Sequence, residues 1–174
     1  MDKTLTAYVT NLGKYNEGYL VGEWVDFPIS KAEEEELMER IGIGEEDEFG
    51  QPYEEYFISD YEIYDIDFLK CYGEYVNIET LNEVAEYIRE MSDNTYRLLC
   101  AVLEDGDISD IREFNEEEYI WWQGKDKIDV AESEVDEIYY DLPDRIKNCI
   151  DYEKYADWYM DDYVETKYGT FLRR

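Results

Sequence analysis

The 174-residue sequence contains no histidine, only three prolines and only three cysteines. Without histidine, neither a Ser-His-Asp nor a Cys-His catalytic arrangement can be built, and a metal site would lack its commonest side-chain ligand. The cysteines, Cys71, Cys100 and Cys149, are odd in number and widely spaced, which predicts free thiols in a reducing, cytoplasmic compartment. These absences lead us to expect a protein that is not an enzyme and that uses no metal and no cofactor.

Other signals of membrane, nucleotide or calcium chemistry are also missing. No apolar run approaches the roughly 18 residues that span a bilayer, and the N-terminus lacks the apolar stretch of a secretory signal. The sequence has no CxxC pair, no GxGxxG and no GxxxxGK[ST] motif. An EF-hand loop centred on Gly50 would place Phe49 and Tyr56 where calcium ligands are required, so this interpretation fails.

Positive charge is scarce: 16 Lys and Arg residues face 47 Asp and Glu residues, which gives a net charge of -31. Hydrophobic residues make up 44% of the chain and aromatic residues 17%, enough to bury a core, so the charge must lie on a folded surface. Such a surface repels itself, and a basic partner would relieve the repulsion. Nucleic acids and anionic membranes are disfavoured as partners because they are negative themselves.

Hydrophobic periodicity predicts an α+β fold of three small modules, with boundaries where the periodicity changes. Residues 1–69 are expected to form a three-stranded sheet with one helix, residues 70–115 a small helical bundle, and residues 116–174 a mixed α/β module. Their net charges are -15, -7 and -9, so the acid is spread over the whole chain rather than gathered in a tail.

In the first module, Leu5–Asn11, Leu20–Phe27 and Tyr53–Tyr61 predict strands, because apolar residues recur at every second position. Gly13–Gly18 predicts a turn between the first two strands. Ser30 followed by Glu33 predicts a capping box at the start of a helix.

In the second module, Asn77 predicts the cap of a helix that runs through Glu90, and Asp93 the cap of a helix that ends at Gly106. In the third module, Tyr119–Gln123 and Tyr168–Leu172 predict strands, whereas Ile128–Tyr140 and Tyr152–Asp162 predict helices.

Regularly spaced carboxylates can take the place of phosphates. Duplex DNA carries one charge per about 1.7 Å, so a charge of -31 corresponds to about 50 Å of duplex. We therefore interpret the protein as a DNA mimic that occupies the basic groove of a DNA-binding enzyme. The candidate phosphate mimics are Glu33, Glu34, Glu35, Glu36, Glu45, Glu46, Asp47, Glu48, Glu54, Glu55, Asp60, Glu62, Asp65 and Asp67.

Three alternatives remain open at this point. The charge could serve solubility alone, as in acidic cytoplasmic or halophilic proteins. An acidic chaperone or binder of basic proteins such as histones would have the same composition. A carboxylate-based hydrolase is also conceivable, although 47 acids produce carboxylate pairs at any spacing by chance.

The third module has more aromatic residues than its own core requires, which predicts a homodimer interface. The candidate interface residues are Tyr119, Trp121, Trp122, Tyr139 and Tyr140.

Ala7–Gly18, continuing through Leu20–Trp24, resembles the start of the ArdA antirestriction proteins, and Glu54–Glu62 and Asn148–Ala156 resemble later segments of the same family. The resemblance runs in order from residue 7 to about residue 160. It implies an elongated three-module DNA mimic that dimerises through its C-terminal module and blocks the DNA-binding groove of type I restriction–modification enzymes. It also implies a gene on a mobile genetic element.

Overall fold

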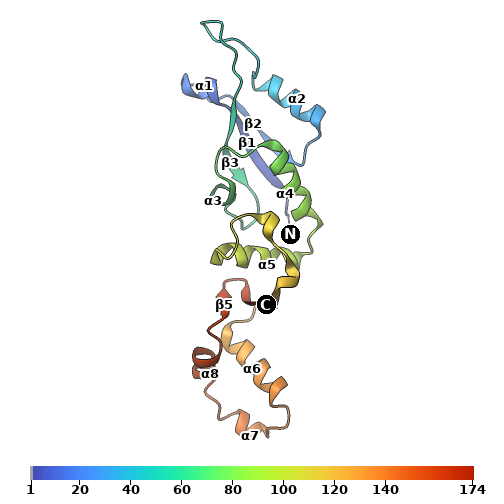
Figure 1. Ribbon diagram of the computed structural model, residues 1–174, viewed down its shortest axis with the longest axis vertical. Helices are drawn as coiled ribbons and strands as arrows, with labels where there is room; N and C mark the ends of the chain where they lie inside the picture. The colour runs from blue at the N-terminus through green and yellow to red at the C-terminus, as the bar shows by residue number, and fades with distance from the viewer. Residues whose placement is uncertain (1) are drawn as a thin grey trace. The chain divides into compact units, whose positions relative to one another are not determined.

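The computed structural model describes residues 2–174, which form a mixed α+β fold, as predicted (Figure 1). Eight α-helices and two three-stranded antiparallel sheets lie within these residues. Contacts group them into two compact units. Unit 1 comprises the residues up to Met91 together with Asp110–Arg112, and unit 2 comprises Ser92–Ser109 and Glu113–Arg174. The division into three modules stays a prediction.

The sheet of unit 1 has the strand order β2-β1-β3. Strand β1 spans Leu5–Asn11, as predicted, whereas β2 spans only Gly22–Phe27 and β3 spans Tyr56–Glu62. The prediction began β2 and β3 too early. The residues before β2 lie in a loop that is fastened by a 2.9 Å hydrogen bond from the Asn11 backbone N–H to the Val21 carbonyl.

The turn predicted over Gly13–Gly18 is wrong, because a short helix, α1, occupies Leu12–Asn16. Asn11 caps this helix by accepting a 2.9 Å hydrogen bond from the Lys14 backbone N–H. The same buried side chain donates a 3.1 Å bond to the carbonyl of Ile41. A single side chain thus ends β1, starts α1 and fastens the end of the next helix.

Helix α2 spans Lys31–Arg40 and begins with the predicted capping box of Ser30 and Glu33. A short helix, α3, follows at Phe68–Tyr72 and was not predicted. Helix α4, Ile78–Glu90, begins at Asn77 as predicted and packs against β2. Its apolar face is fully buried because Ile78, Leu81, Val84, Ala85 and Ile88 recur at helical spacing.

Unit 2 begins with helix α5, Asp93–Asp105, and contains a sheet with the strand order β4-β6-β5. Ser92 caps α5, one residue before the predicted Asp93, and Gly106 ends it in a left-handed conformation with φ of 86°. Strand β4 spans Tyr119–Gln123, as predicted. Strands β5, Tyr163–Thr166, and β6, Gly169–Arg173, form a hairpin of which only the second strand was predicted, one residue too early.

Two 3-10 turns, η1 (Ile111–Glu113) and η2 (Glu116–Glu118), precede β4. Three helices lie between β4 and β5: α6 (Lys127–Ile138), α7 (Asp144–Lys147) and α8 (Tyr152–Tyr159). Helices α6 and α8 end two and three residues before their predicted ends at Tyr140 and Asp162. They pack on each other through a small core of Val130, Ala131, Ala156 and Met160.

Candidate functional site

The four consecutive glutamates of α2 do not form one surface, because successive residues point about 100° apart around a helix. Glu33 accepts 2.7 Å hydrogen bonds from the backbone N–H and the hydroxyl of Ser30, which lower the pKa of its carboxyl. Glu36 lies 3.8 Å from Arg40, and Glu34 is half-buried beside a groove. Glu35 is exposed, and of the four it is the one that neither caps the helix, pairs with Arg40 nor lines this groove.

The acidic loop after α2 folds back on itself through a backbone bridge between Glu46 and Pro52. The Asp47 carboxylate accepts 2.8 Å hydrogen bonds from the backbone N–H groups of Phe49 and Gln51, so it holds the tip of the loop. At the base, the Glu45 carboxylate accepts a 2.6 Å hydrogen bond from the ammonium of Lys14. Glu46 and Glu48 are exposed on this loop, and so are Glu54 and Glu55 just before β3.

A cavity of about 300 Å³ lies between this loop and α1. Tyr53 borders it and donates its hydroxyl to the Glu17 carboxylate at 2.8 and 2.9 Å. This bond raises the pKa of Tyr53 to about 12, since ionisation would place a second negative charge beside Glu17. Glu17 also lines this cavity, and the sequence did not single it out.

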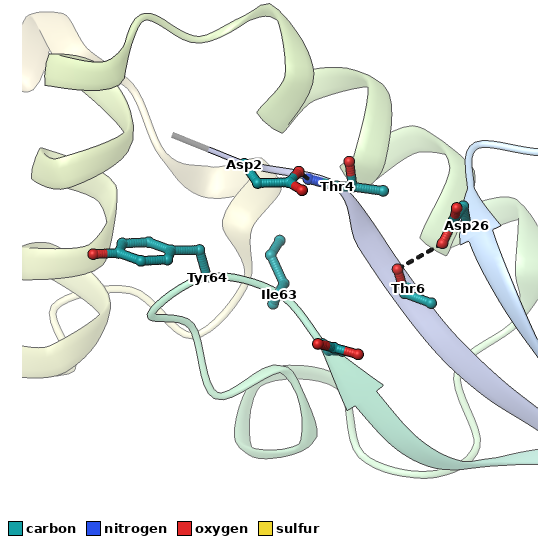
Figure 2. A pocket seen from close by; sticks show the side chains of 7 residues that line it. Asp2, Thr4, Thr6, Asp26, Ile63 and Tyr64 are labelled. Atoms are coloured by element: carbon teal, nitrogen blue, oxygen red, sulfur yellow. Dashed lines mark hydrogen bonds between the residues drawn. The ribbon is translucent and has the colours of Figure 1, made fainter.

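Strand β3 places two predicted carboxylates on one face of the first sheet. Asp60 pairs with Tyr8 of β1 and Glu62 pairs with Thr6, so all four side chains share that face. Asp26 of β2 pairs with Thr6 from the other side and accepts a 2.7 Å hydrogen bond from its hydroxyl (Figure 2). Periodicity within β2 does not single out Asp26, because only strand pairing places it on the same face as Glu62. The face ends in a cavity of about 430 Å³ that is also lined by Asp2, Thr4, Ile63 and Tyr64.

The last two predicted phosphate mimics lie between β3 and α3. Asp67 caps α3 by accepting a 3.1 Å hydrogen bond from the Lys70 backbone N–H. Asp65 has a positive φ of 59°. Both residues are exposed, but Asp67 also stabilises the start of α3 as its N-cap, which accounts for an aspartate at this position.

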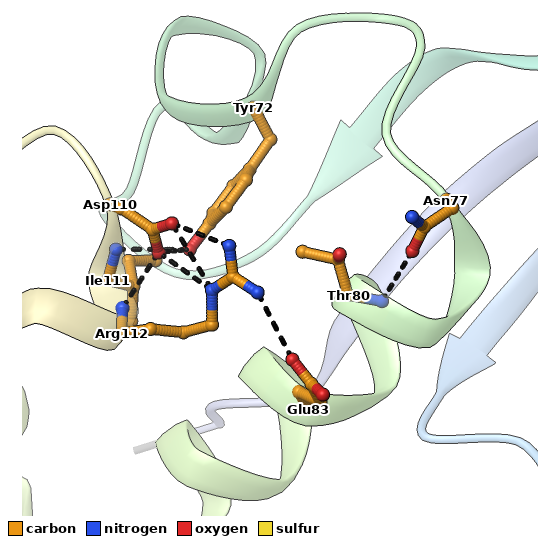
Figure 3. A network of polar contacts seen from close by, with 7 residues as sticks. All are labelled: Tyr72, Asn77, Thr80, Glu83, Asp110, Ile111 and Arg112. Atoms are coloured by element: carbon orange, nitrogen blue, oxygen red, sulfur yellow. Dashed lines mark hydrogen bonds and ion pairs between the residues drawn. The ribbon is translucent and has the colours of Figure 1, made fainter.

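Unit 1 also contains a polar network around Arg112 (Figure 3). The guanidinium of Arg112 contacts Asp110 at 2.7 Å and Glu83 of α4 at 3.2 Å. Asp110 accepts a further 2.7 Å hydrogen bond from the hydroxyl of Tyr72. Arg112 and Tyr72 together lower the pKa of Asp110 to about 2. The carboxylate therefore stays ionised, and the guanidinium of Arg112 balances its charge.

The predicted dimer residues occupy different environments in unit 2. Tyr119 is only 5% exposed; it stacks on Phe114 and donates a 2.7 Å hydrogen bond to Asp107. Trp122 stacks on Tyr163 at 5.5 Å within the same unit.

Trp121 is half-buried and donates its indole N–H to Asn94. Tyr139 and Tyr140, at the end of α6, are 45% and 81% exposed. Trp158 and Tyr159 of α8 are exposed too, and the sequence analysis did not single them out as interface residues.

Within residues 2–174, no three Cys, Asp or Glu side chains converge closely enough to hold a metal ion. In the same part of the chain, no helix combines the length and the apolar character needed to cross a membrane.

Comparison with known proteins adds a finding that the geometry alone does not give. No curated protein matches the chain. The sequence pattern of a family described as antirestriction protein (ArdA), however, matches residues 7–172, which cover most of both units and every predicted phosphate mimic. The chain therefore belongs to the ArdA family of antirestriction proteins.

Proposed function

We propose that the protein inhibits type I restriction–modification enzymes by occupying their DNA-binding groove, with its exposed carboxylates in the places of DNA phosphates. Membership of an antirestriction family supports inhibition of restriction. The charge of -31 supports a basic groove as the target. The protein acts as a non-enzymatic inhibitor in the cytoplasm, and its gene resides on a mobile genetic element.

The observation that carries this proposal is the set of solvent-facing carboxylates in unit 1. Glu35 on α2, Asp60 and Glu62 on β3, and Glu46, Glu48, Glu54 and Glu55 in the loop between α2 and β3 are all exposed. Exposed carboxylates keep their charge available to a partner, whereas Asp110 is neutralised by Arg112. A partner with Lys and Arg at DNA-phosphate spacing would therefore gain ion pairs without having to break those that stabilise the fold.

The direct test is a DNA-cleavage assay with a purified type I enzyme, titrated with this protein, together with competition against a fluorescent duplex that carries the recognition site. We expect the protein to displace the duplex and to need proportionally higher concentrations as duplex is added. If the protein binds histone but does not displace the duplex from the enzyme, the result would favour the alternative of a general binder of basic proteins.

A pair of matched variants tests whether the enzyme recognises a defined surface of the protein. One variant replaces four carboxylates of unit 1 by glutamine, at Glu46, Glu48, Glu54 and Glu55. The control neutralises four other exposed carboxylates, at Glu90, Asp105, Glu113 and Glu117. Because each exposed pair contributes under about 1 kcal/mol, we expect the first variant to lose about tenfold in inhibition and the control much less. Equal losses would contradict a defined surface.

We also propose a homodimer that uses the exposed aromatic residues at the end of α6. Tyr139 and Tyr140 are more exposed than aromatic side chains usually are, and exposed aromatic residues commonly anchor interfaces. Sedimentation velocity of the wild type and of a double variant with serine at both positions is the measurement. We expect a dimer for the wild type and a monomer for the variant; a wild-type monomer at micromolar concentration would refute the proposal.

A further inference from the structure

The sheet of unit 1 has one covered face and one open face. On the covered face, Leu5, Ala7 and Val9 of β1 are fully buried. The open face, here called the outer sheet face, consists of Thr6, Tyr8, Trp24, Asp26, Asp60 and Glu62. Strand register sets its composition, since residues paired across an antiparallel sheet project to the same side.

Two aromatic rings lie side by side on the outer sheet face, Tyr8 on the central strand β1 and Trp24 on the edge strand β2. Trp24 is 46% exposed, and its ring meets the ring of the neighbouring Tyr8 edge-on, with centroids 5.3 Å apart and an interplanar angle of 63°. Tyr8 leans against Gly22, where an added Cβ would lie 2.8 Å from Cε1 of the tyrosine ring. The glycine thus makes room for Tyr8, and Tyr8 in turn supports the indole of Trp24.

Carboxylates lie on two sides of this aromatic pair. Asp26 follows Trp24 on the same face of β2, and Asp60 lies directly across Tyr8 on β3. Glu62 lies opposite Asp26 across the three strands, at a distance set by two strand spacings, about 10 Å. Thr6 lies between these two carboxylates and donates a 2.7 Å hydrogen bond to Asp26 (Figure 2).

We propose that the outer sheet face is the docking surface for an arginine-bearing segment of the partner, with one guanidinium stacked on Trp24 and ion-paired with Asp26, and a second arginine ion-paired with Asp60. This inference rests on the proposed function and specifies the part of unit 1 that binds the enzyme. A guanidinium is planar and weakly hydrated, so it stacks on an aromatic ring while its edge binds carboxylates. Tryptophan is the aromatic side chain that attracts cations most strongly.

The surface would combine two kinds of attraction for arginine. The carboxylates offer the negative charge of phosphates, and the indole offers a flat π-face on which a guanidinium can stack. Lysine, a compact and strongly hydrated cation, gains less from the aromatic pair. A preference for arginine over lysine therefore separates this proposal from attraction by charge alone.

The first experiment measures binding of hexa-arginine and hexa-lysine peptides to the full chain by calorimetry at physiological salt. We expect hexa-arginine to bind more tightly, and Trp24→Leu to weaken it about fivefold while changing hexa-lysine binding less than about twofold. Trp158→Leu is the matched control, because Trp158 is also exposed but lies in unit 2 on α8. Equal losses for both peptides, or the same loss in the control, would overturn the proposal.

A second pair of variants keeps the test independent of folding. Asp26→Asn and Asp60→Asn preserve the shape of the face, and we expect each to reduce hexa-arginine binding about threefold. Unchanged urea midpoints would show that the fold is intact. No loss in either variant would refute the role of the carboxylates.

The enzyme assay then links the surface to inhibition. With a type I enzyme, Trp24→Leu should raise the concentration for half-inhibition about fivefold, and Trp158→Leu should not. If the wild type fails to inhibit, the proposed function is refuted, and the docking surface is then judged by the peptide-binding measurements alone. If the wild type inhibits and Trp24→Leu inhibits equally well, the docking surface is refuted while the proposed function stands.

Discussion

Replacing Tyr72 by phenylalanine removes one hydroxyl that makes two hydrogen bonds inside unit 1. The hydroxyl donates to the Asp110 carboxylate at 2.7 Å and accepts from the backbone N–H of Ile111 at 3.0 Å. The side chain of Ile111 is fully buried, so water cannot readily replace the lost acceptor. Phenylalanine otherwise fills the same volume and keeps the 5.0 Å ring contact with Phe68.

The expected cost follows from which group is left without a partner. Asp110 keeps its ion pair with Arg112, so its charge stays compensated. The Ile111 N–H loses its acceptor, and an unsatisfied buried donor costs about 1–3 kcal/mol. We therefore expect Tyr72→Phe to lower the free energy of unfolding by about 2 kcal/mol.

Urea denaturation of the full chain, followed by circular dichroism, measures this loss as a shift of the midpoint at an unchanged m-value. Tyr75→Phe is the control, because the Tyr75 side chain is 75% exposed and its hydroxyl is not part of this network. We expect the control to change stability by less than about 0.5 kcal/mol. If Tyr72→Phe falls within the same margin, the network does not stabilise unit 1 and the reasoning is wrong.

Three further outcomes are expected. The pKa of Asp110 is held at about 2, below its unfolded value, so its stabilising effect is present above about pH 4 and is lost as the pH falls toward 2. Urea curves should therefore show a stability gap between wild type and Asp110→Asn that is constant above pH 5 and shrinks below pH 4. Gly13→Ala should destabilise the protein by about 1 kcal/mol in the same assay, because the new Cβ would lie 2.3 Å from a ring carbon of Tyr53; a stabilised variant would contradict the packing. Glu48→Gln should weaken inhibition of cleavage less than about fivefold, since one exposed carboxylate contributes under about 1 kcal/mol, and abolished inhibition would point to a specific ligand role.

A salt series belongs with these tests. Affinity for the enzyme should fall as salt rises, but with a shallower slope than for duplex DNA, because carboxylates on a protein lie further apart than phosphates and condense fewer ions. Parallel titrations of both ligands between low and physiological salt give the two slopes. A slope near zero would remove the electrostatic basis of the mimicry proposal.

Local signals in the sequence predicted much of the fold. The capping box at Ser30, the cap at Asn77 and the glycine at Gly106 act within one helical turn, so neighbouring residues alone define them. Strand β5 was missed because Tyr163–Thr166 gains its strand conformation by pairing with β6. Helix α1 was missed because its five residues, Leu12–Asn16, are too few to show a helical period.

The candidate site was less predictable, since carboxylates that face solvent and carboxylates that hold backbone look alike in a sequence. Asp47 and Asp67 were predicted as phosphate mimics, yet they accept hydrogen bonds from their own loop and helix. Asp26 was not singled out, although it shares a face with Asp60 and Glu62. Register between strands that are distant in the sequence decides such groupings, and periodicity within one strand cannot supply it.

The three residues Asp110–Arg112 belong to unit 1, although the chain on both sides of them belongs to unit 2. This interruption has a consequence for synthesis on the ribosome, where domains generally fold as units from the N-terminus. A nascent chain that has reached only Met91 already contains the whole first sheet, but Tyr72 and Glu83 still lack the groups that they bind in the finished protein. The last contacts of unit 1 form only after α5 has been translated, so completion of the first unit waits for part of the second.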